Sequence, residues 1–146
     1  MKKRRRYVII GKQRLTERKK IMNIRESGEM YLETIYVLSK KSSAVRSIDV
    51  GEALCFSKPS VSRAVGLLKK DGLVKTDESG YLKLTTLGEE RAKMIYERHT
   101  LLSRLLTNIG VDEETAVEDA CRIEHYISEK TFEAIKRHEE KYGFKK

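Results

Sequence analysis

The strongest constraint on the fold is a stretch in the first half of the chain, where two short helical patterns precede a hairpin pattern. Helices are predicted for SIDVGEALCF and KPSVSRAVGLLKK, with a tight turn between them and Gly72 ending the second. Strand-forming residues on both sides of the polar ESG bend, in VKTDESGYLKLT, predict two strands. A plain three-helix core would share the helical part, and the hairpin is what favours a winged helix-turn-helix that binds DNA.

The rest of the chain is predicted to be helical. One helix over 27–38 precedes the motif, and three follow it, from Thr85 or Thr86 to Asn108, from Asp112 to about Ile127, and from Ser128 to Gly143. These last helices have more apolar positions than one winged domain can cover, so the surplus is assigned to a homodimer interface. The predicted fold is mainly α, with an N-terminal winged helix-turn-helix, an α-helical dimerisation domain and no third domain. The predicted divisions are a basic N-terminal extension over 1–21, the winged domain over 22–90 and the helical domain over 91–146.

The basic residues are unevenly distributed. The net charge is +9, but residues 1–20 hold ten Lys or Arg and one acidic residue, so the remainder is neutral. The extension is interpreted in three ways: an arm that contacts phosphates, a disordered tail, or residues ahead of a native start at Met22. Residues 40–75 carry eight basic and three acidic residues, a charge balance suited to a polyanion.

Composition and cysteine content exclude several classes of protein. No apolar run approaches the roughly 20 residues that a membrane span needs, and no signal peptide pattern follows the basic start, so we expect a cytoplasmic protein without membrane contact. Two cysteines are too few for a disulfide framework and are expected to be reduced.

The segment ACRIEH predicts a metal site. Cys121, Glu124 and His125 are spaced three and four residues apart and share one helix face. A thiolate, a carboxylate and an imidazole suit a divalent transition metal, although a buried cysteine beside a solvated Glu-His pair would give the same pattern. His99 lies on the long helix that is expected to pack beside this one, and Met30 and Glu33 share a face of the first helix. Each of these is a candidate ligand, with core packing or solvent exposure as the simpler reading.

An enzyme is not expected. A helical Cys121–His125 pair has no evident oxyanion hole or third orienting group. The sequence also contains no Gly-rich phosphate loop, no paired thiol motif and no HExxH.

The chain resembles the family of metal-dependent repressors that includes the diphtheria toxin repressor and the manganese transport regulator. The matching motifs, in order over residues 26 to about 138, are EMYLETIY, KPSVSRAV, KKDGLV, LTTLGEERA, ERHTLL and ACRIEH. The resemblance implies a homodimer whose metal-loaded form binds palindromic double-stranded operators and represses metal-uptake genes. Metal binding between helix one and the C-terminal helices would switch on operator binding.

The resemblance implies a mixed ligand set. Met30, Cys121, Glu124 and His125 match the primary site of iron-responsive members. Glu33 and His99 match ligands of the manganese-responsive binuclear site, where Asp and Glu would replace Met30 and Cys121, so a second ion held by Glu33, His99 and Glu124 is an open alternative. The resemblance makes the helical domain a dimerisation and metal-binding domain, with no SH3-like third domain expected. The ancillary iron site, which that third domain completes, is not reproduced, because Ser103 and Val117 stand where its Glu and His would be. The sensed metal is expected to be Fe(II) or Mn(II): the shortness of the chain and Glu33 favour Mn(II), whereas sulfur at Cys121 favours Fe(II), which is the preferred assignment.

The candidate DNA contacts lie at the start of the second helix of the motif. Arg63 could read guanine, while the lysine and serines would hold phosphates, and simple solvent exposure is the alternative. The full set is Ser57, Lys58, Pro59, Ser60, Ser62 and Arg63. Two other functions stay open: a metal-independent winged-helix regulator, and a metal-binding protein without DNA specificity.

Overall fold

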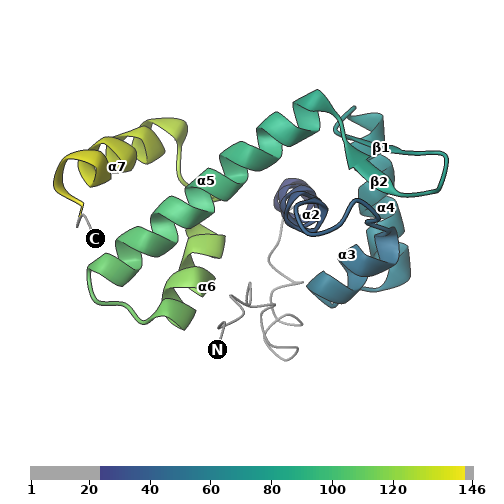
Figure 1. The fold of residues 1–146 in the computed structure, drawn as a ribbon. Coiled ribbons are helices and arrows are strands. Elements are labelled where there is room, and N and C mark those ends of the chain that lie inside the picture. The colour runs from purple at the N-terminus through teal and green to yellow at the C-terminus, as the bar shows by residue number, and fades with distance from the viewer. Residues whose placement is uncertain (1–23, 144–146) are drawn as a thin grey trace. The chain divides into compact units, whose positions relative to one another are not determined.

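The computed structural model describes residues 24–143, so the predicted extension over 1–21 lies outside the described residues. The chain divides into two compact units, the first ending at Lys93 and the second beginning at Met94. The described residues form six helices and one hairpin (Figure 1). The elements are α2 (Ile24–Ser39), α3 (Ser47–Leu54), α4 (Lys58–Lys70), β1 (Val74–Thr76), β2 (Leu82–Leu84), α5 (Thr86–Asn108), α6 (Glu113–Ile123) and α7 (Glu129–Tyr142).

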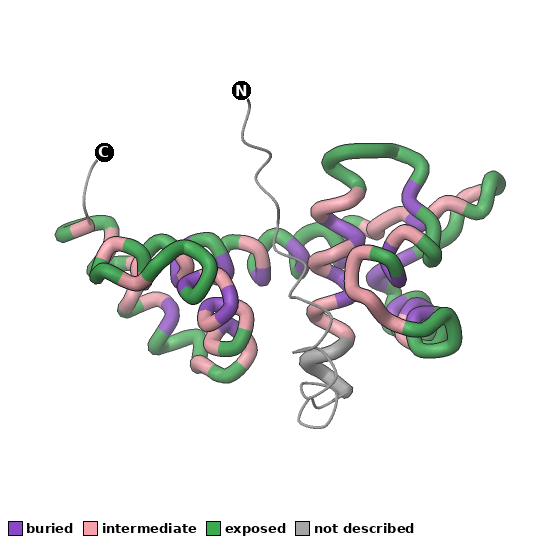
Figure 2. Tube along the Cα trace, turned by 90° about the horizontal axis from the view of Figure 1, so that it is seen from below, coloured by how far each residue is buried: buried purple, intermediate pink, exposed green. Residues whose placement is uncertain are grey.

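The first unit is built on the predicted helix-turn-helix. Helix α2 packs on both α3 and α4, and α3 packs on α4. The α4 side chains predicted to face inward are buried, with Val61, Val65 and Leu68 each 4% exposed or less. They alternate with exposed positions along the helix, as Figure 2 shows for the elements of this unit. The amphipathic pattern therefore fixes which face of α4 meets the core and which faces solvent.

Both ends of α4 are fixed by local hydrogen bonds. At the N-terminus, the Ser57 hydroxyl accepts a hydrogen bond from the Ser60 N–H, and Pro59 lies in the first turn. At the C-terminus, the Gly72 N–H donates to the Lys69 carbonyl and the next N–H donates to the Leu68 carbonyl. Gly72 has a positive φ of 72°, the left-handed conformation that this Schellman cap requires and that glycine adopts without strain.

The hairpin predicted after α4 is present as the wing. Strands β1 and β2 pair antiparallel, with Lys75 opposite Lys83. The bend is held by the Asp77 carboxylate, which accepts hydrogen bonds from the N–H groups of Ser79 and Tyr81. Beyond β2, the Thr85 hydroxyl accepts a hydrogen bond from the Gly88 N–H and so caps α5. Thr85 and Thr86 were the two candidates for this cap.

The second unit contains the rest of α5 together with α6 and α7. Helices α6 and α7 begin where predicted, because Asp112 and Ser128 accept hydrogen bonds from the N–H groups of Thr115 and Thr131. The prediction that α6 continues to about Ile127 is wrong, since the helix ends at Ile123.

A tight turn follows the end of α6. The N–H groups of Tyr126 and Ile127 both donate to the Ile123 carbonyl, which closes the turn instead of extending the helix. Glu124 and His125 therefore belong to a connection between α6 and α7, which spans residues 124–128. None of the described helices combines the length and apolar character that crossing a bilayer requires.

Candidate metal centre and nucleic-acid interface

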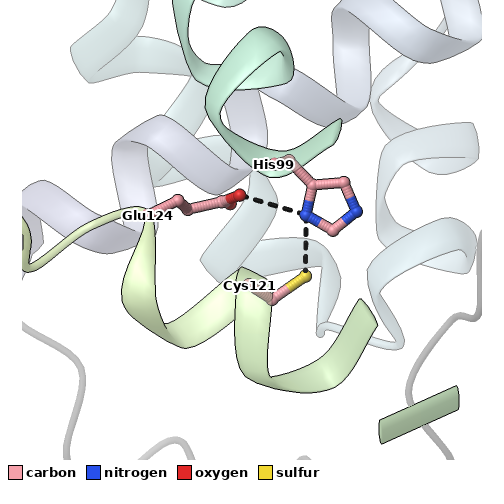
Figure 3. A group of neighbouring side chains, drawn as sticks. All are labelled: His99, Cys121 and Glu124. Atoms are coloured by element: carbon pink, nitrogen blue, oxygen red, sulfur yellow. Dashed lines mark hydrogen bonds and ion pairs between the residues drawn. The ribbon is translucent and has the colours of Figure 1, made fainter. Parts of the chain in front are cut away.

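Three predicted ligands meet in the second unit. His99 projects from α5, Cys121 from α6, and Glu124 from the residue that follows α6 (Figure 3). The His99 Nδ1 atom lies 3.0 Å from Glu124 Oε2 and 3.5 Å from Cys121 Sγ. One nitrogen, one sulfur and one oxygen atom thus lie within 4.8 Å of one another. The structure brings together side chains that are 22 to 25 positions apart in the sequence.

His99 and Glu124 are buried and Cys121 is half-buried, and these neighbouring groups shift one another's pKa values. Burial favours the neutral form of His99, but hydrogen bonds and charge from Cys121 and Glu124 outweigh burial and raise its pKa above the usual range. Burial likewise opposes ionisation of Glu124, while the close approach of His125, together with the hydrogen bond and charge of His99, prevails and lowers its pKa. Without a metal, the arrangement favours a carboxylate beside a protonated imidazole.

One oxygen of the Glu124 carboxylate lacks a hydrogen bond. The Glu124 side chain is only 1% exposed, and its Oε1 atom makes no hydrogen bond with the described residues. His125 Nε2 lies 3.2 Å from this oxygen, close enough for charge attraction but without hydrogen-bond geometry. A buried anionic oxygen without a donor is costly, and a cation would relieve that cost.

The cluster has the composition and spacing of a transition-metal site. Ligand atoms about 2.0–2.3 Å from one ion lie roughly 3–4 Å from one another, close to the separations seen around His99. Imidazole, thiolate and carboxylate together match a borderline divalent transition metal better than Ca²⁺ or Mg²⁺, which prefer oxygen ligands. His99, Cys121 and Glu124 therefore fit such an ion, and His125 adjoins them through Glu124.

The other two predicted ligands lie on α2 in the first unit. Met30 and Glu33 are both half-buried, and they are three positions apart on one helix face. Their part in metal binding stays a prediction.

All the predicted DNA contacts lie at the exposed N-terminal end of α4. The set consists of Ser57, Lys58, Pro59, Ser60, Ser62 and Arg63, and every member is exposed. Ser57 also stabilises the start of α4, since its hydroxyl caps the helix and lies 2.8 Å from the Ser60 hydroxyl. The capping role of Ser57 was missed, although a serine two residues before a proline is a recognisable helix start.

Sequence reasoning also missed Arg98, the residue before His99. Its guanidinium donates a hydrogen bond to the Glu124 carbonyl and forms an ion pair with Glu129. No spacing rule would have found it, because one of its partners is a backbone atom. The only sequence feature that could have drawn attention to Arg98 is its position next to the candidate ligand His99 in ERHTLL.

Two family models match the chain in succession. Residues 23–82 match the iron dependent repressor N-terminal DNA binding domain. Residues 85–142 match the iron dependent repressor metal binding and dimerisation domain. The models therefore assign DNA binding to the winged unit and metal binding with dimerisation to the helical unit.

Named relatives agree with the family models. The HTH-type transcriptional regulator MntR of Lysinibacillus sphaericus is 38% identical over 109 residues, which cover 75% of this chain and 78% of that protein. The iron-dependent repressor IdeR of Mycobacterium leprae is 37% identical over 105 residues, 71% of this chain but only 46% of that protein. Among solved structures, T. acidophilum IdeR matches with a TM-score of 0.68 and 28% identity, over 80% of this chain and 54% of that one.

These matches confirm the predicted mainly α fold, in which a winged helix-turn-helix precedes a helical domain, and the predicted function of a metal-dependent DNA-binding repressor. The relatives are transcriptional regulators, and both iron-dependent and manganese-dependent members occur among the matched proteins. A divalent metal is therefore supported for this chain, without a choice between the two. The chain belongs to the iron-dependent repressor family, and its relatives include the diphtheria toxin repressor and the HTH-type transcriptional regulator MntR.

Proposed function

We propose that the protein is a cytoplasmic repressor that senses Fe(II) in preference to Mn(II) and controls metal-uptake genes. The observation that carries this proposal is the cluster of buried His99 and Glu124 with half-buried Cys121, in which Glu124 Oε1 accepts no hydrogen bond from the described residues. Sulfur at Cys121 favours the softer Fe(II) over Mn(II), which is bound better by oxygen ligands. His125, Met30 and Glu33 are proposed as further ligands, the last two from the resemblance.

The ligands of the metal form are expected to change protonation state on binding. A bound cation would supply positive charge that replaces the proton on His99 and satisfies the Glu124 carboxylate. The released proton makes binding pH-dependent. Ligands from both Glu33 and Glu124 would also allow a second ion, the arrangement expected of manganese-responsive members.

The DNA-binding part of the proposal rests on α4. Its exposed N-terminal end carries Lys58 and Arg63, and its last turn carries Lys69 and Lys70, while the inward face is apolar. Arg63 is proposed to read guanine in the major groove, and Lys58 with the serines to hold phosphates. Metal binding needs to change operator affinity by only about 5- to 150-fold, or ~1–3 kcal/mol, to act as a switch.

A homodimer on a palindromic operator completes the proposal. Large apolar side chains are exposed in the second unit, to which the family model assigns dimerisation. They are Met94 (52% exposed), Ile109 (70%), Tyr126 (66%) and Tyr142 (63%). A two-fold dimer would cover such positions and present two copies of α4 to two half-sites.

Selection of DNA from a randomised double-stranded pool tests the whole proposal. The protein is incubated with the pool under anaerobic conditions in four separate samples, containing Fe(II), Mn(II), Zn(II) or a chelator. We expect a palindromic sequence to be enriched only with metal, and affinity for that sequence to reach half-saturation at lower free Fe(II) than Mn(II).

Two cysteine variants provide a matched comparison in this experiment. Cys121→Ser should weaken the response to Fe(II) more than the response to Mn(II), whereas Cys55→Ser, in the first unit, should respond as the wild type does. Equal enrichment with chelator would identify a metal-independent regulator. Metal binding without any enriched sequence would identify a metal-binding protein that lacks DNA specificity.

A further inference from the structure

Arg98 joins three parts of the second unit. Its Nη1 atom donates to the Glu124 backbone carbonyl at 3.3 Å, and its Nη2 atom pairs with the Glu129 carboxylate. The guanidinium carbon also lies 5.2 Å from the centre of the Phe132 ring, which is buried at 3% exposure. The Arg98 side chain is 19% exposed, so these contacts are made in a largely desolvated setting.

These contacts hold both ends of the α6–α7 connection, residues 124–128. The Glu124 carbonyl is one of the groups that the end of α6 leaves without a helical partner, and Glu129 is the first residue of α7. A cation beside the C-terminal end of α6 also interacts favourably with the helix dipole. The connection is fixed to α5 at two points by one side chain.

The same connection carries two of the proposed ligands. Glu124 is therefore held from both directions by adjacent residues of α5, through its carbonyl by Arg98 and through its carboxylate by His99. His125 follows directly and faces Glu124 Oε1. Groups that orient metal ligands from outside the site typically change metal affinity by about 10- to 100-fold when they are removed.

We propose that Arg98 is a positioning residue that fixes the α6–α7 connection so that Glu124 and His125 face the metal centre before an ion binds. The proposal rests on the proposed metal site. Arg98 makes no contact with the ion, and it acts through the backbone of Glu124. A fork of several donors suits this task, since one end binds a carbonyl while the other binds a carboxylate.

The test is Co(II) binding to the full chain, followed by the absorption of the bond between Co(II) and the Cys121 thiolate. In Arg98→Ala we expect the affinity for Co(II) to fall by about 10- to 100-fold. The thiolate absorption should still appear at saturation, because Cys121 lies on α6 and not on the connection. General loss of structure would abolish that absorption together with the affinity.

Lys136→Ala is the matched control. Lys136 pairs with Glu97 at 2.6 Å, so it links the same helices, α5 and α7, one position away from Arg98, but this pair does not touch the connection. Its Co(II) affinity should equal that of the wild type. Arg98→Lys and Glu129→Gln should give intermediate losses, since each keeps part of the Arg98 contact set, and they replace Arg98→Ala as the test if that variant does not fold.

The outcomes separate this inference from the proposed function. Wild-type affinity in Arg98→Ala, with the thiolate absorption intact in both proteins, would overturn the positioning role alone. An equal loss in Lys136→Ala would also overturn it, because the effect would then belong to any contact between α5 and α7. Absence of the thiolate absorption in the wild type would overturn the metal centre itself.

Discussion

The two units of the molecule differ in what their cores contain. In the described part of the first unit the buried side chains are hydrophobic, tyrosines included, and no charged side chain is buried. The second unit buries three ionisable side chains, His99, Glu118 and Glu124, at 8% exposure or less. Burying ionisable groups is unfavourable unless they are paired. Their presence in this core therefore indicates a function beyond stabilising the fold.

The difference shows how a switch can be confined to one part of a chain. Hydrophobic burial and local caps hold the first unit together, so we expect its stability not to depend on a ligand. The second unit depends on balanced charges that an ion can replace, and its stability should respond to pH and to metal. The following predictions test this contrast, from the largest expected effect to the smallest.

Glu124→Ala should have the largest effect. It leaves His99 buried without its carboxylate partner, and breaking a buried ion pair costs about 3–5 kcal/mol. Urea unfolding of the metal-free protein, followed by circular dichroism, measures the loss, and metal affinity should fall as well. Glu114→Ala, an exposed carboxylate on the same α6, should change little. Equal effects of the two substitutions would contradict the assignment of a special role to the buried carboxylate.

Gly88→Ala should destabilise the first unit by about 2–3 kcal/mol through packing alone. A Cβ atom at Gly88 would lie 1.9 Å from the Leu73 carbonyl oxygen, so the backbone of the wing or of α5 would have to move. Gly66→Ala on α4 is the control, because a Cβ atom there meets nothing within 4 Å and should stabilise the helix by ~1 kcal/mol. Thermal unfolding measures the stability of both variants. A Gly88→Ala protein as stable as the wild type would contradict the close approach of Gly88 to the Leu73 carbonyl.

Arg63→Ala should weaken operator binding by about 1–3 kcal/mol and relax the preference for one base pair, while metal affinity stays unchanged. Arg91→Ala removes the same charge from an exposed site on α5 and serves as the control. Fluorescence anisotropy with the selected operator and with single-base variants measures both quantities. Unaltered sequence preference would show that Arg63 contacts phosphates only.

The free energy of local unfolding should depend on pH in the second unit but not in the same way in the first. Each shifted group changes it by up to about 1.4 kcal/mol per pH unit. The raised pKa of His99 contributes stability that is complete below its ordinary value of 6.5 and is lost as pH rises towards the folded pKa. The lowered pKa of Glu124 contributes stability that is present above 4.5 and is lost as pH falls below that value. Metal-free α6 should therefore be most stable between pH 4.5 and 6.5.

Hydrogen exchange measured by mass spectrometry, corrected for the intrinsic rate, checks this pH prediction. Protection in α6 should fall on either side of the window, whereas protection in α4 should not follow the same curve. Added metal should remove the loss at high pH, because a cation replaces the proton on His99. Parallel curves for α4 and α6 would contradict the contrast between the units.

The elements that the sequence predicted well are those with local causes. Gly72 and Gly110 end helices, Thr85 caps α5, and Ser128 caps α7, because each acts on the backbone within four residues. The wing followed from alternation and a polar bend. These signals need no knowledge of the tertiary structure.

Other features depend on contacts that no local pattern encodes. The end of α6 at Ile123 places Glu124 outside the helix, and the Arg98 contact with the Glu124 carbonyl joins positions 26 apart. Helical spacing alone grouped Cys121 with Glu124, and the approach of His99 was expected only from the packing of its helix. Whether Met30 and Glu33 join the same ion remains a prediction, since the ligand set came from resemblance.

The cap at Ser57 limits which residues can start α4. Asp and Asn cap helices as well as Ser does, and Asp adds a favourable charge at the helix N-terminus. Folding alone would therefore tolerate Ser57→Asp. A helix end that must approach phosphates would not, because the new carboxylate would repel the DNA backbone. If Ser57 also contacts phosphates as predicted, a library at this position screened once for folding and once for operator binding should return different residues.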